Sequence, residues 1–417
     1  MKISRLAGLY TGQGFRKKDG RRPTLEDATF VKGPLDIVVE GGRIQAIRPS
    51  EAKIGEADFC AEGLFATSAW FDSHTHALFE GERSSEFFLR WQGAQYADIA
   101  AQGGGIHNTN RATEDASDFE LQRNLGRRLD QMRRSGVTGA EVKTGYSATP
   151  EGELRLLRVL KAYLESTLGK SGPRCYRTFL PLHALPKGVD EKTFVDAMIS
   201  LIPTIAKEAL ADGVDAFPDK GFFSLSESLR FSKIARANGL NLKIHADEIT
   251  PVGASEAFAE LGALSVDHLQ RISQLGLDSL SRTSTVAALL PATSFFLGID
   301  YAPARKIIDA GARFALASDF NPGTAPVYDF RFTQLLAASQ MKLSPAEILC
   351  ASTFGAAAAL GWEENLGTIE EGKFADLLLW EARSPHSNSW LAELFTNLQP
   401  PTAIFQAGQL VGESKHP

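Results

Sequence analysis

The sequence predicts an α/β protein: a (β/α)8 barrel of the TIM type with a small β-sandwich domain built from both ends of the chain. Two observations predict the barrel. Short apolar strand patterns alternate with amphipathic helix patterns through the middle of the chain, and about eight such units fit there. Strand patterns with turn signals at both termini predict the small domain. The expected boundaries are residues 1–63 and 362–417 for the β domain and 64–361 for the barrel.

The N-terminal strands are predicted from a hairpin pattern. Residues 35–40 (LDIVVE) and 43–47 (RIQAI) are β-type runs joined by Gly41-Gly42, a dipeptide typical of tight turns. Similar runs return in residues 372–380 and 402–411. We therefore expect the two termini to combine into one β domain.

The central segment repeats a strand followed by a helix, a pattern that favours parallel β/α architecture. The predicted strands lie near residues 139–142, 177–182, 214–217, 241–244, 264–267, 285–289 and 313–317, and the predicted helices lie at 151–168, 191–211 and 225–238, from about 255, from 273 and near 302–310. The uncharged stretch 283–299 is interrupted by Pro291 and too short to span a membrane, so we expect buried strand and loop there. In such barrels the chemistry collects where strands end.

Composition and charge narrow the class of partner. The chain has 417 residues, of which 43% are apolar and 23% charged, and its formal net charge is -6. Binding to nucleic acid or to an anionic membrane needs clustered Lys and Arg, so neither partner is expected. We expect a small-molecule substrate instead. The three cysteines, Cys60, Cys175 and Cys350, form neither a disulfide framework nor a Cys-x-x-Cys metal site, which favours a reducing cytoplasm. The first 22 residues lack the apolar segment of a signal peptide.

Two histidines at the end of an apolar run are the first indication of a metal site. His74 and His76 close the segment 71–76 (FDSHTH). Because side chains alternate along a strand, both imidazoles would point the same way and can bind one metal ion. Taken alone, the pair is better explained as a polar strand end, so the hypothesis depends on further ligands.

Later strand ends supply these ligands. His245, His268 and Asp319 each follow a predicted strand. With the first pair, His245 and Asp319 complete a mononuclear site that leaves a position for water. A bound divalent metal lowers the pKa of such a water toward neutrality and so produces a nucleophile. Each residue has a simpler explanation, as a core histidine, a structural donor or a helix cap, but the joint pattern is much harder to obtain by accident.

Glu248 is the candidate general base. It follows His245 by three residues, which places it just past the strand and close to the metal. There it can take a proton from water and pass it to the leaving nitrogen. The alternative is a glutamate favoured by the dipole at a helix start. His268 is a candidate to orient the water or to stabilise the oxyanion.

Together these motifs resemble the amidohydrolase superfamily and, within it, the imidazolonepropionase family of histidine degradation. The wider resemblance rests on the histidine pair, the His-x-x-Glu spacing, the strand-end His268 and the aspartate. The closer resemblance rests on longer blocks in the same order, of which the last is the most specific: residues 71–83 (FDSHTHALFEGER), 103–106 (GGGI), 143–146 (KTGY), 178–184 (TFLPLHA), 245–248 (HADE), 267–269 (DHL) and 319–324 (DFNPGT).

The resemblance implies one divalent metal ion, zinc or iron, and hydrolysis of the cyclic amide 4-imidazolone-5-propanoate to N-formimidoyl-L-glutamate by a cytoplasmic homodimer. It implies the metal ligands His74, His76, His245 and Asp319. It implies the catalytic residues Glu248 (the proton shuttle), His268 and Asp319. It implies a substrate pocket formed by Arg83, Tyr96, Tyr146, His183, Asn321, Gly323 and Thr324.

Spacing alone supports part of this pocket. Arg83 lies seven residues after His76, which keeps it near the metal, where a guanidinium suits a substrate carboxylate. A surface ion pair with Glu82 or Glu86 explains Arg83 about equally well. Tyr146 sits just past a predicted strand, which suits either a hydroxyl donor to substrate or a packing tyrosine.

Three departures from the family pattern fall on the pocket wall rather than on the metal ligands. The chain has Pro181-Leu182 before His183 where the family has Gly-Ala, and Pro218-Asp219 where it has a Cys-Glu pair. Ser147 follows Tyr146 where the family has Gly. The hydrolytic chemistry is unaffected by these changes, but the identity of the substrate stays open.

Two alternatives therefore stay open. The first is another enzyme of the superfamily, acting on a different cyclic amide or deaminating a nucleobase-like ring with the same metal ligands. A nucleobase pocket needs amide or carboxylate partners for the ring edges, whereas Arg83 favours an acid. The second is an inactive barrel that serves as a scaffold, which the retention of every predicted ligand and of Glu248 disfavours. Three histidines and an aspartate accept zinc, iron or manganese.

Overall fold

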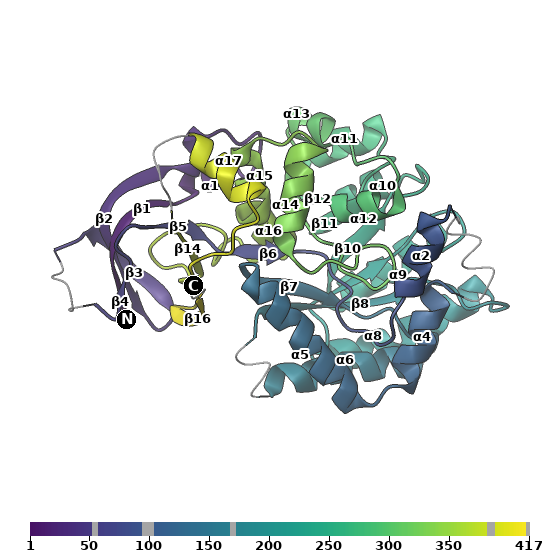
Figure 1. The fold of residues 1–417 in the computed structure, drawn as a ribbon. Coiled ribbons are helices and arrows are strands. Elements are labelled where there is room, and N and C mark those ends of the chain that lie inside the picture. Colours follow the sequence, from purple (N-terminus) through teal and green to yellow (C-terminus); the bar gives the residue numbers. More distant parts are fainter. Residues whose placement is uncertain (52–56, 94–103, 167–171, 382–387, 414–417) are drawn as a thin grey trace.

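The central feature of the computed structural model, which describes residues 1–51, 57–93, 104–166, 172–381 and 388–413, is an eight-stranded parallel sheet. Its strands follow the order of the chain: β6 Trp70–Asp72, β7 Val137–Lys143, β8 Arg174–Leu182, β9 Gly213–Ala216, β10 Asn241–Ala246, β11 Ser265–His268, β12 Val286–Leu289 and β13 Arg313–Leu316. The segments that follow the first and last strands meet in a parallel bridge between Thr75 and Phe320. The amide of His76 donates to the carbonyl of Phe320 at 2.9 Å, and the amide of Asp319 donates to that of His74 at 3.1 Å. The predicted barrel is confirmed (Figure 1).

Helices connect the barrel strands and cover the outside of the sheet (Figure 1). They are α2 Ser84–Trp91, α4 Ile106–Asp115, α5 Asp118–Arg134, α6 Pro150–Glu165, α8 Glu191–Lys207, α9 Leu225–Ala237, α10 Ala254–Glu260, α11 Gln274–Arg282, α12 Pro291–Leu297, α13 Ala304–Ala310, α14 Phe330–Ser339, α15 Pro345–Ser352 and α16 Phe354–Ala359. Several begin at side-chain caps that the sequence supplies. Ser117 and Glu120 form a capping box at α5, and Thr149 caps α6, which has Pro150 in its first turn.

The stretch 283–299 differs in part from its prediction. The buried strand is present as β12, but the residues after it form α12 rather than loop. Pro291 occupies the first turn of this helix, where a missing amide hydrogen removes no helical bond. The proline that was expected to interrupt regular structure therefore begins a helix.

The two termini build a second, mixed sheet of eight strands. Its members are β1 Lys2–Tyr10, β2 Phe30–Glu40, β3 Arg43–Pro49, β4 Phe59–Cys60, β5 Leu64–Ser68, β14 Leu377–Glu381, β15 Ala403–Gln406 and β16 Gln409–Glu413, in the order β16-β15-β14-β5-β1-β2-β3 with β4 beside β1. Short helices α1 Gln13–Lys17, η1 Glu26–Ala28 and α17 Asn388–Thr396 accompany it. The small β domain built from both termini is confirmed, and Figure 1 shows both chain ends on this side of the molecule. The division at residues 63 and 361 stays a prediction; by hydrogen bonding, β5 pairs with the terminal sheet.

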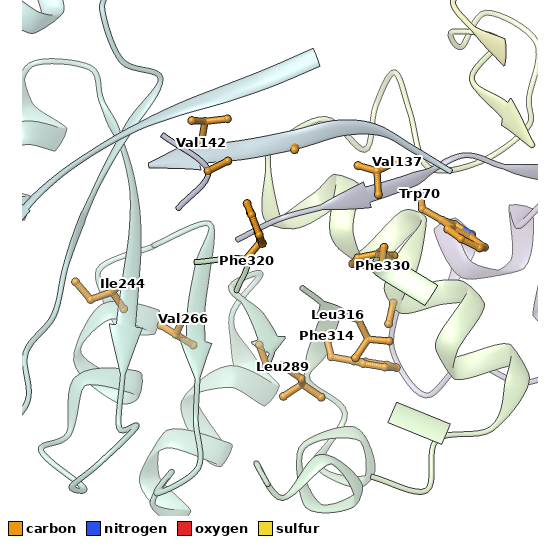
Figure 2. Close-up of a cluster of buried hydrophobic side chains, with 14 of the residues drawn as sticks. Trp70, Val137, Val142, Ile244, Val266, Leu289, Phe314, Leu316, Phe320 and Phe330 are labelled. Atoms are coloured by element: carbon orange, nitrogen blue, oxygen red, sulfur yellow. The ribbon is translucent and has the colours of Figure 1, made fainter. Parts of the chain in front are cut away.

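Each sheet has its own apolar core. Figure 2 shows the barrel core, with Val142, Val266 and Leu316 among its members. The two sheets meet at two tryptophans: the ring of Trp70 on β6 lies 5.3 Å from that of Trp380 on β14. No helix in the described part of the chain has both the length and the apolar character to cross a membrane.

Candidate metal centre and active site

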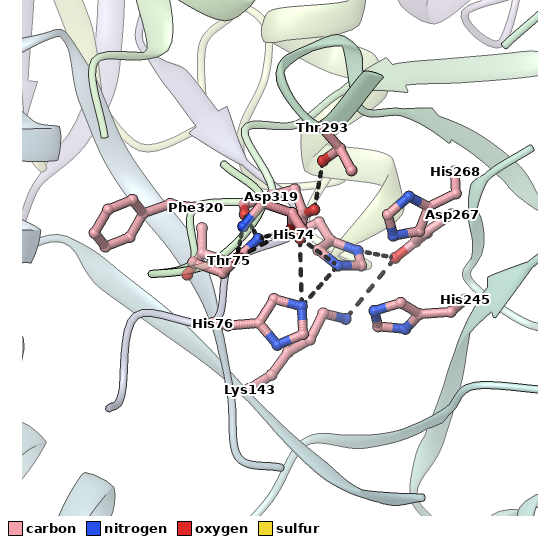
Figure 3. Close-up of polar contacts among 12 residues, drawn as sticks. His74, Thr75, His76, Lys143, His245, Asp267, His268, Thr293, Asp319 and Phe320 are labelled. Carbon is pink, nitrogen blue, oxygen red and sulfur yellow. Dashed lines mark hydrogen bonds and ion pairs between the residues drawn. The ribbon is translucent and has the colours of Figure 1, made fainter. Parts of the chain in front are cut away.

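The predicted ligands of the first histidine pair and Asp319 meet at the carboxyl end of the barrel strands (Figure 3). His74 Nε2 lies 3.2 Å from His76 Nε2, and each of these atoms lies 3.4 Å from Asp319 Oδ1. All three side chains are buried. The ring of His245 stands beside them, with its centroid 4.6 Å from that of His74 and 5.5 Å from that of His76.

This donor set fits a divalent cation. Ligand atoms around one tetrahedral zinc ion lie about 3.3–3.5 Å apart, and the separations between His74, His76 and Asp319 match that spacing. His245 offers a ring nitrogen within 4.8 Å of ligand atoms of His74 and His268, and likewise of His76 and His183. The buried Nδ1 of His76 has no hydrogen-bond partner. A cluster of imidazoles and a carboxylate is the chemistry of a zinc or iron site.

Two aspartates that sequence reasoning did not assign hold the histidine rings. His74 Nδ1 donates to Asp267 Oδ2 at 2.6 Å, and His245 Nδ1 lies 2.9 Å from Asp215 Oδ2. A carboxylate behind a ligating histidine fixes its tautomer and its orientation, leaving the other nitrogen for the metal. Asp215 could have been noticed because it is a charged residue inside a short, fully buried strand.

The backbone at the site is strained. Asp247, His268 and Asp319 have φ angles of 50°, 80° and 55°, in the left-handed region that residues with a Cβ rarely adopt. Asp247 directly follows β10, His268 ends β11, and Asp319 lies three residues after the end of β13. Such conformations persist only where the surroundings enforce them, and they concentrate at functional sites.

Glu248 and His268 face each other beside the ligand cluster. Glu248 Oε1 lies 3.6 Å from His268 Nδ1. Burial, together with repulsion by Asp319, raises the pKa of the Glu248 carboxyl to about 8. Burial lowers the pKa of His268 to about 3, so this imidazole stays neutral near pH 7 and keeps one N–H to donate. A carboxyl with a raised pKa next to a neutral imidazole is an arrangement suited to proton transfer.

One cavity of about 910 Å³ joins the ligand cluster to most of the predicted substrate residues. Among the residues that line it are His76, Arg83, Tyr146, His183, Glu248, His268, Asp319, Asn321 and Thr324. Tyr96 lies outside the described residues. Sequence reasoning missed several apolar wall residues, namely Ile106, Phe217, Phe222, Ile249, Phe295 and Phe296.

The predicted Arg83 is paired with Glu86, but inside the cavity wall rather than at the surface. Its Nε lies 3.0 Å from both carboxylate oxygens, and its Nη2 lies 2.9 Å from Oε2. Arg90 joins the same carboxylate at 3.6 Å and donates to the carbonyl of Gly323 at 2.7 Å. A Cβ on Gly323 would lie 2.0 Å from Arg83 Nη1, so only glycine allows this approach. Among the described residues, two guanidiniums and one carboxylate form this part of the wall, which we call the cationic patch.

Asn321 organises the turn that carries Gly323 and Thr324. Its Oδ1 accepts from the amides of these two residues at 2.8 and 2.7 Å, and its Nδ2 donates to the carbonyl of Asp319 at 2.7 Å. The turn closely follows Asp319, the predicted metal ligand. These hydrogen bonds hold residues 319–324 in one turn beside the ligand cluster.

The departures from the family pattern have structural roles. Asp219 accepts from the amides of Ile249 and Thr250 at 2.9 and 3.1 Å and from the Thr250 hydroxyl, which ties down the loop after Glu248. Ser147 donates from its hydroxyl to Glu114 Oε1 at 2.9 Å, which anchors the loop of Tyr146. The proline and leucine before His183 are buried in β8.

Comparison with known proteins agrees with this geometry. The sequence model described as the amidohydrolase family matches residues 69–411. The chain is 40% identical over 350 residues to an imidazolonepropionase of Caldanaerobacter subterraneus subsp. tengcongensis (83% of each chain), and 38% identical over 386 residues to that of Porphyromonas gingivalis (90% of each chain). It is 39% identical over 392 residues to that of Geobacillus thermodenitrificans (91% of each chain).

Solved structures show the same fold at low sequence identity. A triazine hydrolase from Arthobacter aurescens is 16% identical with a TM-score of 0.72, over 100% of this chain and 95% of that chain. An adenosine deaminase from Xanthomonas campestris with bound zinc is 15% identical with a TM-score of 0.68, over 98% and 92% of the two chains. These likenesses concern the fold alone.

Proposed function

Because the chain belongs to the amidohydrolase family and, within it, to the imidazolonepropionases, we propose that it hydrolyses 4-imidazolone-5-propanoate to N-formimidoyl-L-glutamate in histidine degradation. The observation that supports this best is a single cavity with a metal-ligand cluster on one wall and a cationic patch on another. A ring amide and a carboxylate are the two features of the substrate that need such walls.

The proposal assigns one divalent metal ion, zinc or iron, to His74, His76, His245 and Asp319. The spacing of the ligand atoms and the carboxylates behind the histidines support this assignment. When bound, a divalent cation supplies a Lewis acid that polarises the ring carbonyl and makes a water molecule nucleophilic near neutral pH. A nearby divalent charge also opposes the effect of burial on Glu248 and favours its ionised form.

In this mechanism Glu248 moves one proton. It removes a proton from the attacking water as the oxygen bonds to the ring carbonyl carbon. It then delivers this proton to the ring nitrogen as the carbon–nitrogen bond breaks, which produces the new carboxyl group and the formimidoyl group. His268, held neutral by burial, donates its N–H to the developing oxyanion.

Arg83 is proposed to bind the propanoate carboxylate, because a buried guanidinium offers paired donors in a geometry that a carboxylate matches. Tyr146 and His183 are assigned to the ring: their rings lie 5.7 Å apart, and that of His183 stacks 4.9 Å from His76. Asn321, Gly323 and Thr324 form the wall next to Arg83. Tyr96 completes the proposed set. We extend the proposal to a cytoplasmic homodimer. Light scattering of the purified protein tests the oligomeric state.

The test is turnover of freshly generated 4-imidazolone-5-propanoate by the metal-loaded protein. We expect ring opening, followed as loss of imidazolone absorbance and as appearance of N-formimidoyl-L-glutamate. An imidazolone with an ethyl group in place of the propanoate serves as the matched substrate. Arg83→Met should lower kcat/KM for the acid about 100-fold, since a charge-assisted hydrogen-bond pair is worth roughly 2–3 kcal/mol, and should leave the ethyl analogue nearly unchanged.

The alternatives predict other outcomes. Metal-bound protein that leaves both imidazolones intact but releases ammonia from a nucleobase would support the deaminase hypothesis. Metal-bound protein that opens the ethyl analogue as efficiently as the acid would point to a different cyclic amide, because the cationic patch would then have no carboxylate to bind.

A further inference from the structure

Five charged side chains are completely buried beneath the metal-ligand cluster. They are Glu141 and Lys143 on β7, Asp215 on β9, Lys243 on β10 and Asp267 on β11, and the side chain of each is 0% exposed. Desolvation makes buried charges costly unless they are paired in good geometry. Buried charges at this place in the barrel therefore indicate a functional role. The two aspartates indicate which one, because each contacts a histidine that is a proposed metal ligand.

Lys143 is the cation that these carboxylates share. Its Nζ lies 2.6 Å from Asp215 Oδ2, 2.9 Å from Glu141 Oε2 and 3.8 Å from Asp267 Oδ2. Figure 3 shows its ammonium directed at the space between the ligand histidines and Asp267. The same Asp267 oxygen accepts from His74, and the same Asp215 oxygen contacts His245. Asp215 Oδ2 therefore contacts both the Lys143 ammonium and the ring of His245. Asp267 Oδ2 lies between the ammonium and the ring of His74 in the same way, at the longer distance from the ammonium.

We infer that Lys143 is a positioning residue of the metal centre: its ammonium fixes the carboxylate of Asp215, which in turn holds the ring of His245 with its second nitrogen toward the metal. The inference rests on the proposed metal-dependent function. Without this cation, Asp215 would lose its lysine partner and would be repelled by the other buried carboxylates in an environment of low dielectric constant. The ring of His245, which contacts Asp215, would move with it.

The protonation of Lys143 is consistent with this role. Burial by itself would lower its pKa, but attraction by Asp215, Glu141 and Asp267 outweighs burial and raises the pKa above the usual value for lysine. The ammonium is therefore charged near neutral pH. A charged group is what a fixed support for the Asp215 carboxylate requires.

Lys243 provides a matched control in the same cluster. It is equally buried and lies on β10, and its short contacts are with the Ser265 hydroxyl at 2.6 Å and the Ala359 carbonyl at 3.2 Å. Its distances to Glu141 and Asp267 are 3.8 and 3.9 Å. Asp267 is therefore supported by both lysines, since Lys243 is as close to it as Lys143 is and Ser265 donates to its Oδ1. Lys243→Met removes the same charge and a similar volume but leaves the contact between Lys143 and Asp215 intact.

The experiment measures metal binding without substrate. Full-length Lys143→Met and Lys243→Met proteins are stripped of metal, checked for folding by circular dichroism, and titrated with Zn²⁺ against a chromophoric chelator; a parallel Co²⁺ titration records the visible absorption of the site. We expect Lys143→Met to bind Zn²⁺ about 10–100-fold more weakly, with an altered Co²⁺ spectrum, as is typical when partners of ligating histidines are removed. Lys243→Met should stay within about 3-fold of the wild-type protein.

Equal affinity in Lys143→Met and wild type, or equal losses in the two lysine variants, would overturn the inference. If Lys143→Met fails to fold, Glu141→Gln/Lys143→Met replaces it, since it restores the net charge of the cluster while leaving Asp215 without its lysine partner. Wild-type affinity in that double variant would also overturn the inference. A wild-type protein that binds no metal would instead refute the proposed function, and one that binds metal but opens no imidazolone would refute the proposed substrate alone.

Discussion

The core of the terminal sheet and the carboxyl end of the barrel bury different kinds of side chain. The core of the terminal sheet is mainly apolar, with Ile37, Leu377 and Phe405 among its members. The carboxyl end of the barrel buries lysines, aspartates and histidines within a few ångströms of one another. Apolar burial stabilises a fold, whereas buried ion pairs at best offset the cost of desolvating them. The comparison suggests a division of labour in which the terminal sheet supports stability and the barrel end supports chemistry.

The largest effect should follow from Glu248→Gln at the barrel end. Glutamine keeps the shape of the side chain but can neither accept nor deliver the proton, so kcat for imidazolone hydrolysis should fall about 10²–10⁴-fold. Because Glu248 is not among the proposed ligands, Zn²⁺ stoichiometry and the melting temperature should not fall. Steady-state kinetics with metal analysis check this. A variant that loses metal together with activity would show that Glu248 acts as a ligand instead.

The opposite pattern is expected for Phe405→Ala in the terminal sheet. This side chain is fully buried and packs edge-on against Phe59, so its removal should lower the free energy of unfolding by about 3–5 kcal/mol. Below the unfolding temperature, kcat/KM and metal content should stay near the wild-type values. Urea unfolding measures the loss, and Leu410→Ala, at an exposed position of the adjacent β16, is the control with an effect within about 0.5 kcal/mol. A large loss of activity in Phe405→Ala would break the division of labour.

A buried carboxyl away from the metal ligands should make the barrel end sensitive to pH. Glu153 accepts from the amides of Gly145 at 3.0 Å and Ser147 at 2.9 Å, and burial raises its pKa from 4.5 to about 7. Because the pKa is higher in the folded protein than in the unfolded chain, the contribution of Glu153 to stability is fully present below pH 4.5. It is lost as the pH rises to about 7.

We expect this loss to amount to at most about 3 kcal/mol in the free energy of unfolding between pH 4.5 and 7, and Glu153→Gln should remove it. Urea midpoints of both proteins across this range provide the measurement. The test compares slopes, because other groups titrate equally in the two proteins. Parallel profiles of variant and wild type would mean that Glu153 does not exchange a proton in this window.

Much of this molecule could be predicted from the sequence because its signals are local. Strand and helix periods located the barrel units, and the strand-end positions of His74, His76 and Asp319 predicted that they would meet, as the interatomic distances show. The supports of the site were not predictable in the same way. Lys143 contacts Asp215, which is 72 residues away in the chain, and no spacing rule relates the two. For Arg83 the sequence left two possibilities, a substrate carboxylate or an ion pair with a nearby glutamate at the surface. Only the fold could show that its pair with Glu86 lies inside the cavity wall.

Asp219 gives the smallest predicted effect and tests how far the site extends. In the sequence, Asp219 is a departure from the family pattern at the pocket wall; its contacts show that it holds the backbone after Glu248.

Asp219→Asn keeps one accepting oxygen but directs an NH₂ group toward amide donors, so the loop should loosen and kcat should fall about 10-fold, or roughly 1.4 kcal/mol in the barrier. Asp219→Glu, which retains the carboxylate, should recover most of this rate. Zn²⁺ affinity should stay constant in both variants, since Asp219 contacts none of the proposed ligands. A change in KM with constant kcat would instead indicate that Asp219 acts on substrate binding at the pocket wall. It would also mean that the rate of the chemical step depends on the proposed metal ligands and Glu248 but not on the loop after Glu248.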